Sequence, residues 1–170
     1  MDSLTLQKIE TAHPKLRDEL KQIYGEICSV LTGRVKCRFP FVFRTIKEQD
    51  ELYAQGRTKL FDTNGKRLGV VTQVKGGGSF HNYGLAVDIV MLIDTDGNGT
   101  FETASWDTKK DSDKDGMSDW MECVTIFKKY GWEWGGNWKK FKDAPHFQKT
   151  FGYTTTQLKK IPLVNGYPQI

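Results

Sequence analysis

The stretch that decides the fold reads Leu85-Ala86-Val87-Asp88-Ile89-Val90-Met91-Leu92-Ile93. It is a continuous apolar run interrupted only by Asp88, a pattern that predicts a buried central strand. A charged aspartate inside a buried strand costs several kcal/mol of free energy unless it is paired or bound to a cation. Asp88 is therefore the first candidate functional residue.

A second candidate lies seven residues earlier, at His81. The turn-permitting segment Asn82-Tyr83-Gly84 separates it from the predicted strand, and a strand that begins at a glycine turn can bring an imidazole and a carboxylate to one point. Zinc accepts both kinds of ligand, and catalytic zinc sites commonly use three protein ligands and leave one position open. The pair predicts a zinc site that needs one more ligand.

The remaining histidines are His13 and His146. His13 precedes Pro14 in a polar segment, so we expect a surface position at the start of a helix and no metal. His146 follows Asp143-Ala144-Pro145 and opens a predicted strand, and the proline restricts the backbone before it. His146 is the expected third ligand, with Asp143 close enough to take a proton from an attacking water and return it to a leaving amine. The spacing alone leaves open that these residues are merely structural.

Composition is that of one globular domain: 38% hydrophobic, 27% charged and a formal net charge of +4. This mild positive charge suits attraction to an anionic polymer such as cell wall, and it is too small and scattered to indicate nucleic acid as a partner. No stretch approaches the roughly twenty apolar residues of a membrane span, and Met1 to Glu10 lacks the apolar run of a signal peptide. We expect a monomer.

Periodicity predicts an α+β fold, a small and mostly antiparallel sheet flanked by helices. We expect helices over 4–31 (one or a pair), 46–55 and 118–130, strands over 39–43 and 85–93, two strand fragments within 131–147, and loop over 62–78. The single domain, 1–170, divides into a helical segment 1–34, a catalytic core 35–153 with an acidic insert 94–122, and an irregular tail 154–170.

Two motifs give a family resemblance. Ser79-Phe80-His81-Asn82-Tyr83-Gly84-Leu85-Ala86-Val87-Asp88 resembles the S-x-H-x-x-G-x-A-x-D signature of the zinc D-alanyl-D-alanine carboxypeptidase and L-alanyl-D-glutamate endopeptidase family. Asp143-Ala144-Pro145-His146 resembles its second signature. Phe43-Arg44-Thr45 with Glu48-Gln49 looks like the arginine segment of the family, and Trp134-Gly135-Gly136-Asn137-Trp138 like its tryptophan-glycine loop. The resemblance covers about residues 40 to 150.

The resemblance implies a hedgehog-type fold, one zinc ion and hydrolysis of peptides that contain a D-residue. By position, His81, Asp88 and His146 would bind zinc, and Asp143 would be the general acid and base. Arg44 would stabilise an oxyanion or a substrate carboxylate, unless it forms an ion pair with Glu48.

The same resemblance suggests four substrate contacts. Ser79 would orient substrate or hydrogen-bond its own loop, while Tyr83, Trp134 and Trp138 would line the cleft or pack in the core.

The sequences of these motifs are most similar to those of L-alanyl-D-glutamate endopeptidases from phage endolysins and bacterial wall-remodelling enzymes. The expected partner is a peptidoglycan stem peptide in the periplasm or outside the cell, reached through a holin, a secretion system or another release route. The alternatives are a D-alanyl-D-alanine carboxypeptidase and a non-catalytic zinc and calcium module that binds cell wall.

The acidic insert contains a twelve-residue segment that fits an EF-hand calcium loop. Its expected calcium ligands are Asp111, Asp113, Asp115, the backbone carbonyl of Met117, Asp119 and Glu122. A similar segment begins at Asp94, but its twelfth position is Ser105, so we interpret it as a turn or a weak site. Our hypothesis is that calcium fixes the helix that carries Trp120 and thereby braces one wall of the cleft.

The cysteines are Cys28, Cys37 and Cys123, an odd number without C-x-x-C spacing. A disulfide framework is not expected, although one bridge with one free thiol stays open. The apolar helical surroundings of Cys28 and Cys123 predict that both thiols are buried.

Overall fold

The computed structural model describes residues 1–170. The chain begins with two helices, α1 (Ser3–Ile9) and α2 (Arg17–Val30), joined through a 3₁₀ turn η1 (Pro14–Leu16). Asp2 caps α1 by accepting a hydrogen bond from the backbone N–H of Thr5 at 2.9 Å. The segment 4–31 is thus a helix pair, the second of the two predicted arrangements.

The main sheet is antiparallel at every pairing, in the order β1-β2-β5-β4 with β3 also paired to β2. Its strands are β1 (Val35–Phe41), β2 (Ala86–Ile93), β3 (Thr103–Ser105), β4 (Glu133–Trp134) and β5 (His146–Gln148). In this register Asp88 of β2 lies opposite His146 of β5. Strand pairing therefore brings together two of the candidate ligands.

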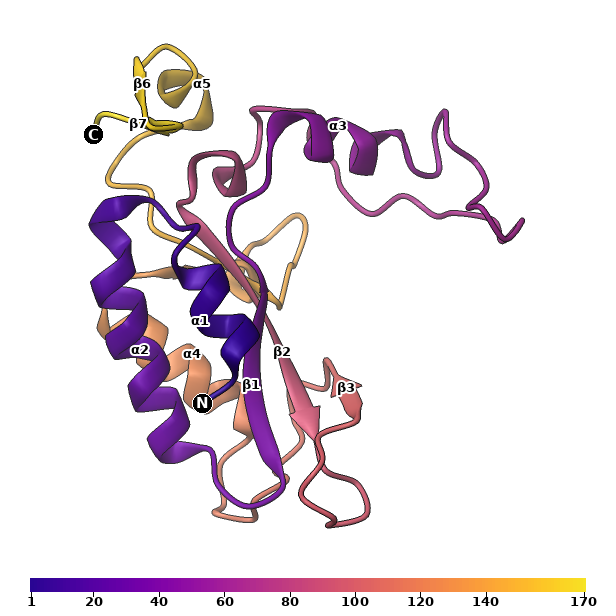
Figure 1. Cartoon of the computed structure of the whole chain (residues 1–170), viewed down its shortest axis with the longest axis vertical. Coiled ribbons are helices and arrows are strands. Elements are labelled where there is room, and N and C mark those ends of the chain that lie inside the picture. Colours follow the sequence, from indigo (N-terminus) through magenta and orange to yellow (C-terminus); the bar gives the residue numbers. More distant parts are fainter.

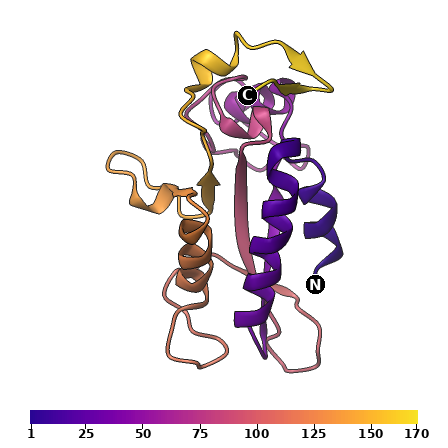
Figure 2. The same ribbon diagram turned by 90° about the vertical axis from the view of Figure 1, so that its left-hand side faces the viewer.

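The alternation of side chains along β2 divides the molecule into two sides. Val87, Ile89 and Met91 enter the hydrophobic core, whereas Asp88 and Val90 face the opposite side, where a cleft lies. Helices α1, α2 and α4 (Asp119–Lys129) lie on the core side of β1 and β2 (Figures 1 and 2). The cleft side is left open by these helices.

An arm extends from the body beyond helix α3 (Ile46–Ala54), which Thr45 and Glu48 cap in a reciprocal capping box. Residues 55–75 leave α3, turn and come back toward 3₁₀ turn η2 (Phe80–Tyr83), as Figure 1 shows. The remaining elements are η3 (Gly135–Asn137), α5 (Thr155–Leu158), β6 (Leu163–Val164) and β7 (Tyr167–Pro168). No helix is long and apolar enough to cross a membrane.

The predicted α+β architecture is confirmed, with helices near 46–55 and 118–130 and a central strand near 85–93. Elements in two regions were missed. Strand β3 lies inside the acidic insert, and the tail contains α5 and the β6–β7 hairpin, so the tail is not irregular.

Strand β1 begins at Val35, earlier than the predicted start at residue 39. Its register shifts between Arg38 and Phe41, around Pro40, which has no N–H for the ladder.

Two burial predictions were wrong. His13 is buried, with its Nε2 2.9 Å from the carbonyl oxygen of Pro168, because the C-terminal hairpin packs over the segment that joins α1 to α2. Cys28 is exposed at the margin of the apolar stripe of α2, while Cys37 and Cys123 are buried. All three thiols are free.

Candidate metal centre and catalytic cleft

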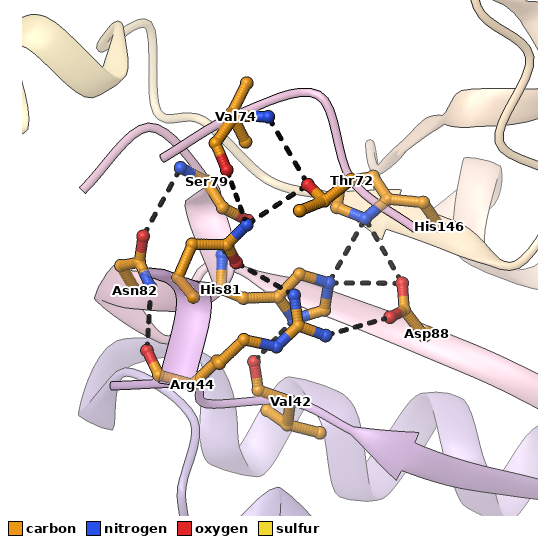
Figure 3. Close-up of polar contacts among 10 residues, drawn as sticks. Val42, Arg44, Thr72, Val74, Ser79, His81, Asn82, Asp88 and His146 are labelled. Carbon is orange, nitrogen blue, oxygen red and sulfur yellow. Dashed lines mark hydrogen bonds and ion pairs between the residues drawn. The ribbon is translucent and has the colours of Figure 1, made fainter. Parts of the chain in front are cut away.

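The three candidate ligands meet at one point (Figure 3). His81 Nε2 lies 3.1 Å from Asp88 Oδ1 and 3.2 Å from His146 Nδ1, and the latter atom is 3.2 Å from the same carboxylate oxygen. His81 comes from η2, Asp88 from the cleft face of β2 and His146 from the first position of β5. A turn and two paired strands therefore build the cluster.

The His81 imidazole is oriented by a backbone carbonyl. Its Nδ1 lies 2.8 Å from the carbonyl oxygen of Val42, which can only accept a hydrogen bond, so the proton resides on Nδ1. The lone pair of Nε2 then points at Asp88.

The His146 imidazole is oriented by Gln148, through its opposite nitrogen. Gln148 Nε2 donates to a carboxylate oxygen of Glu133 at 2.9 Å, which fixes the amide so that its Oε1 faces His146 Nε2 at 3.1 Å. That nitrogen must donate, and the lone pair of His146 Nδ1 then points into the cluster. Gln148 had no role in the sequence interpretation; its position two residues after a candidate ligand on one strand face was the available signal.

The result is a set of three electron-pair donors, two imidazole nitrogens and one carboxylate oxygen, without a proton to share between them when both rings are neutral. Three such atoms in van der Waals contact are stable only around a cation or with an added proton. Two histidines and a carboxylate are ligands that zinc accepts, with room for a further ligand on the open side. The residues thus fit a zinc ion.

The cluster is strongly coupled electrostatically. Burial alone would raise the pKa of Asp88, but the facing imidazoles of His81 and His146 outweigh burial and hold that pKa well below its usual range. Burial alone would lower the pKa of His146. The hydrogen bond and negative charge of Asp88 outweigh this effect of burial, so the pKa of His146 is raised. Asp88 is therefore an anion at neutral pH, as a metal ligand must be.

Arg44 lies at the edge of this cluster. Its Nη2 is 3.7 Å from Asp88 Oδ2, and its Nη1 donates to Gln49 Oε1 at 3.0 Å. Glu48, the alternative partner considered from the sequence, instead caps α3 at Thr45. The guanidinium lines the cleft, and donors on it stay available to a ligand.

Gln49, which is completely buried, connects Arg44 to the returning leg of the arm. Its Nε2 donates to Thr72 Oγ1 at 3.1 Å and to the carbonyl oxygen of Val74 at 2.9 Å. Asn82 holds the backbone of the same arginine by donating to its carbonyl oxygen at 2.9 Å. Gln49 thus positions the side chain of Arg44 and Asn82 its backbone, whereas the sequence interpretation had named both residues only as members of motifs.

Asp143 lines the same cleft. Its backbone N–H donates to the carbonyl oxygen of Gly135 at 3.1 Å, and a Cβ at Gly135 would lie 2.5 Å from the Asp143 carbonyl oxygen, so only glycine fits there. Burial and the nearby negative charge of Asp88 raise the pKa of Asp143. A carboxyl whose pKa is shifted toward neutrality suits proton transfer in both directions.

The cleft has a volume of about 840 Å³. Of the four residues predicted to contact substrate, two line it and two do not. Ser79 and Trp138 line it, and the Trp138 ring lies 5.3 Å from the ring of His146. Ser79 Oγ also accepts from the His81 backbone at 3.3 Å, so it caps η2.

Tyr83 and Trp134 do not line the cleft. Tyr83 is buried and its hydroxyl donates to the Gly77 carbonyl at 2.8 Å, while Trp134 Nε1 donates to the Ala144 carbonyl at 2.7 Å. Tyr83 belongs to the hydrophobic core and Trp134 packs against it, so the alternative of core packing describes both.

The acidic insert forms three carboxylate clusters, and none of their residues lines the cleft. Asp111, Asp113 and Asp115 place oxygens within 4.8 Å of one another, as do Asp113, Asp119 and Glu122. The other loop gathers Asp94, Asp96 and Glu102 in the same way. Trp120 is fully buried in the core, and no residue of α4 lines the cleft, so this helix does not form a wall of it.

Comparisons with known proteins agree with this geometry. Residues 72–149 match the family described as D-alanyl-D-alanine carboxypeptidase, a range that contains the three candidate ligands and Asp143. The peptidoglycan L-alanyl-D-glutamate endopeptidase CwlK of Bacillus subtilis (strain 168) is 49% identical over 106 residues, which are 62% of this chain and 56% of that protein. The match thus spans little more than half of that relative. The resemblance drawn from the motifs is confirmed.

Among solved structures, the crystal structure of Serratia marcescens L-Ala D-Glu endopeptidase ChiX has a similar fold. Its TM-score is 0.53 at 20% sequence identity, and the match covers 89% of this chain and 90% of that one. At this identity the likeness supports the fold alone. It extends the structural similarity beyond the residues of the family match, over almost the whole chain.

Proposed function

We propose that this chain is a zinc peptidase that cleaves the bond between L-alanine and D-glutamate in peptidoglycan stem peptides. The observation that carries the proposal is the convergence of His81 Nε2, Asp88 Oδ1 and His146 Nδ1 at the floor of an open cleft that Asp143 also lines. The similarity to CwlK supports the choice of bond.

In this proposal His81, Asp88 and His146 hold zinc, which when bound supplies a Lewis acid that polarises a carbonyl and makes water more acidic. Asp143 removes a proton from the attacking water and then returns it to the leaving amine. The raised pKa of Asp143 favours the second of these transfers. Arg44 donates to the oxyanion or to a substrate carboxylate from the cleft edge.

A non-catalytic wall-binding module is the alternative from another class. A purely structural zinc site is closed by a fourth protein ligand. Here the cluster opens to the cleft, and a carboxyl with a raised pKa shares that cleft. These features favour an enzyme. Since the target would be cell wall, the protein would act in the periplasm or outside the cell.

The test is digestion of purified peptidoglycan, followed by mass spectrometry of the products with and without a zinc chelator. We expect peptides with a new amino-terminal D-glutamate, and glycan strands whose lactyl groups carry L-alanine alone. The chelator should abolish both products. Release of free D-alanine would establish a carboxypeptidase instead. A zinc-loaded protein that binds wall and releases nothing would establish the module.

We further propose that residues 111–122 bind calcium. Asp113 Oδ1 and Glu122 Oε2 are buried without a hydrogen-bond partner, a costly state for carboxylate oxygens that a cation would relieve. Burial and the charges of Asp115 and Asp113 raise the pKa of Glu122 to about 7. Gly116, with φ of 98°, supplies the sharp turn that such a loop requires.

Calcium there would stabilise a loop and helix start, residues 111–122, that do not line the cleft. Asp113 Oδ2 accepts from the backbone N–H of Thr32 at 2.9 Å, so the loop is tied to the turn between α2 and β1. Glu122 belongs to the first turn of α4. The ion would therefore link two helices of the core side and act on stability, leaving the chemistry of the cleft to zinc.

A further inference from the structure

The cleft continues beyond the metal cluster, along the open face of β2. Asp88, Val90 and Leu92 alternate onto this face, and the latter two are buried yet lie outside the main core cluster. At about 3.3 Å per strand residue, Leu92 lies roughly 13 Å from Asp88. An apolar floor therefore runs from the cluster toward the end of the strand.

Exposed aromatic rings line the cleft around this floor. Phe41, Trp106 and Phe141 line the cleft with exposures of 51%, 59% and 54%. Trp106 directly follows β3, whose Ala104 pairs with Leu92. The acidic insert thus adds a strand to the sheet and, through it, an exposed indole to the far end of the groove.

The basic residues of β1 on this side of the cleft already have partners. Arg38 lines the cleft and donates to both oxygens of Asp2, at 3.1 and 2.7 Å, so its charge is compensated. Lys36, which pairs with Leu92, places its Nζ 3.7 Å from the centre of the Phe101 ring and does not line the cleft. On the other side of the cluster lie Arg44 and the arm, where basic residues outnumber Asp62: Arg57, Lys59, Lys66, Arg67 and Lys75. A neutral group fits the groove, and carboxylates fit the side of Arg44 and the arm.

We propose that the groove of Val90, Leu92 and Trp106 binds the N-acetylated sugar that carries the stem peptide. The inference rests on the proposed function. In peptidoglycan the amino group of L-alanine is joined through a lactyl group to this sugar, so the sugar is the next unit on the amino side of the proposed scissile bond. The carboxylates of the peptide follow on the other side, toward Arg44.

Length and chemistry agree with this occupant. An extended residue spans about 3.3–3.6 Å, so the groove is long enough for L-alanine, the lactyl group and one pyranose ring. The C–H faces of a pyranose are apolar and pack on aromatic rings, while its hydroxyl and acetamido groups stay in water at the rim. The substrate is then a muramyl peptide, with its glycan end at Trp106.

The test compares binding of N-acetylmuramyl-L-alanyl-D-isoglutamine with that of N-acetyl-L-alanyl-D-isoglutamine by calorimetry. It uses the zinc-loaded chain of 170 residues with the substitution Asp143→Asn, and ligand integrity is checked afterwards. We expect about tenfold tighter binding of the sugar-bearing ligand. Trp106→Ala in this background should reduce that affinity ratio to near one, and Trp106→Phe should retain part of it. Phe151→Ala removes an exposed ring that does not line the cleft and should retain all of it.

Equal affinities for the two ligands, or an unchanged ratio in Trp106→Ala, would overturn the inference. Tighter binding of a longer sugarless stem peptide than of the muramyl ligand would show that peptide occupies the groove, and would overturn it as well. Hydrolysis of both ligands by wild-type protein separates the two proposals. If both ligands are cleaved at the same rate, the chain is a peptidase without a sugar site. If neither ligand is cleaved, the proposed peptidase activity is refuted, and the ratio of the two affinities still shows whether the groove binds the sugar.

Discussion

His81 and His146 direct opposite ring nitrogens, Nε2 and Nδ1, to points 3.2 Å apart. The two rings reach this arrangement through different partners, a backbone carbonyl for His81 and the Gln148 side chain for His146. Only the second of these can be removed by substitution. A substitution of Gln148 therefore tests directly how the tautomer of His146 is fixed.

Gln148→Leu should weaken zinc binding by about 10- to 100-fold, because His146 Nε2 loses its acceptor and Nδ1 is no longer the favoured lone pair. Competition against a chelator of known affinity measures the effect. Gln169→Leu makes the same change at an exposed position and should leave zinc affinity unaltered. Unchanged affinity in Gln148→Leu would mean that the sheet alone orients the ring.

Gln49→Leu should lower kcat/KM about tenfold by releasing Arg44, whose Nη1 it holds at 3.0 Å. A double-mutant cycle separates this effect from general damage to a buried site. In an Arg44→Ala background, itself expected to lose about 10²–10³-fold, the Gln49 substitution should cost nothing further. Equal losses in both backgrounds would show that Gln49 supports the fold without positioning the arginine.

Asp143→Asn should keep zinc and lose wall hydrolysis by about 10²–10⁴-fold, since an amide cannot carry the proton from water to the amine. Metal content by mass spectrometry and release of new amino groups from peptidoglycan provide the two readouts. Asp18→Asn, at a side chain 96% exposed, is the matched control. An active, zinc-loaded Asp143→Asn protein would remove the proposed role.

Sequence patterns predicted the centre of this molecule better than its periphery. The anomaly of Asp88 in an apolar run pointed both to the central strand and to the cluster, because a buried carboxylate is too costly without a cation or a partner beside it. The positions of His81 and His146 followed from short-range motifs beside that strand.

What the sequence left undetermined depends on long-range packing. His13 looked like a surface residue because its burial comes from Pro168, at the other end of the chain. Nothing in the sequence around Tyr83 and Trp134 distinguishes an aromatic ring that lines the cleft from one that packs in the core. Trp106 reaches the cleft only through the pairing of β3 with β2, and no local pattern indicates that pairing.

Calcium at one hundred times its dissociation constant should raise the free energy of unfolding by about 2.7 kcal/mol. Glu122→Gln should abolish the increase, and without calcium it should be no less stable than wild type, because the buried carboxylate beside Asp113 and Asp119 is unfavourable there. Thermal unfolding with and without calcium gives both values. Glu102→Gln, in the other acidic loop, should retain the response. The same calcium effect in Glu122→Gln would exclude the site.

His13 should make the docking of the C-terminal hairpin sensitive to pH. Burial lowers the pKa of His13 below its ordinary value of 6.5, with a smaller opposite effect from the hydrogen bond to Pro168. The unfolded chain therefore binds a proton more readily than the folded one. This contribution to stability is fully present above pH 6.5 and is lost as the pH falls through and below that value.

His13→Gln removes the titration while keeping a donor for the Pro168 carbonyl. Between pH 7.5 and 5.5 the free energy of unfolding should fall further in wild type than in His13→Gln, by up to about 1.4 kcal/mol for each unit by which the pKa is lowered. Other titrating groups, the cluster histidines included, contribute equally to both proteins and cancel in the difference. Parallel urea-unfolding results at the two pH values would show that His13 is protonated without cost, and that the hairpin tolerates a charge beneath it.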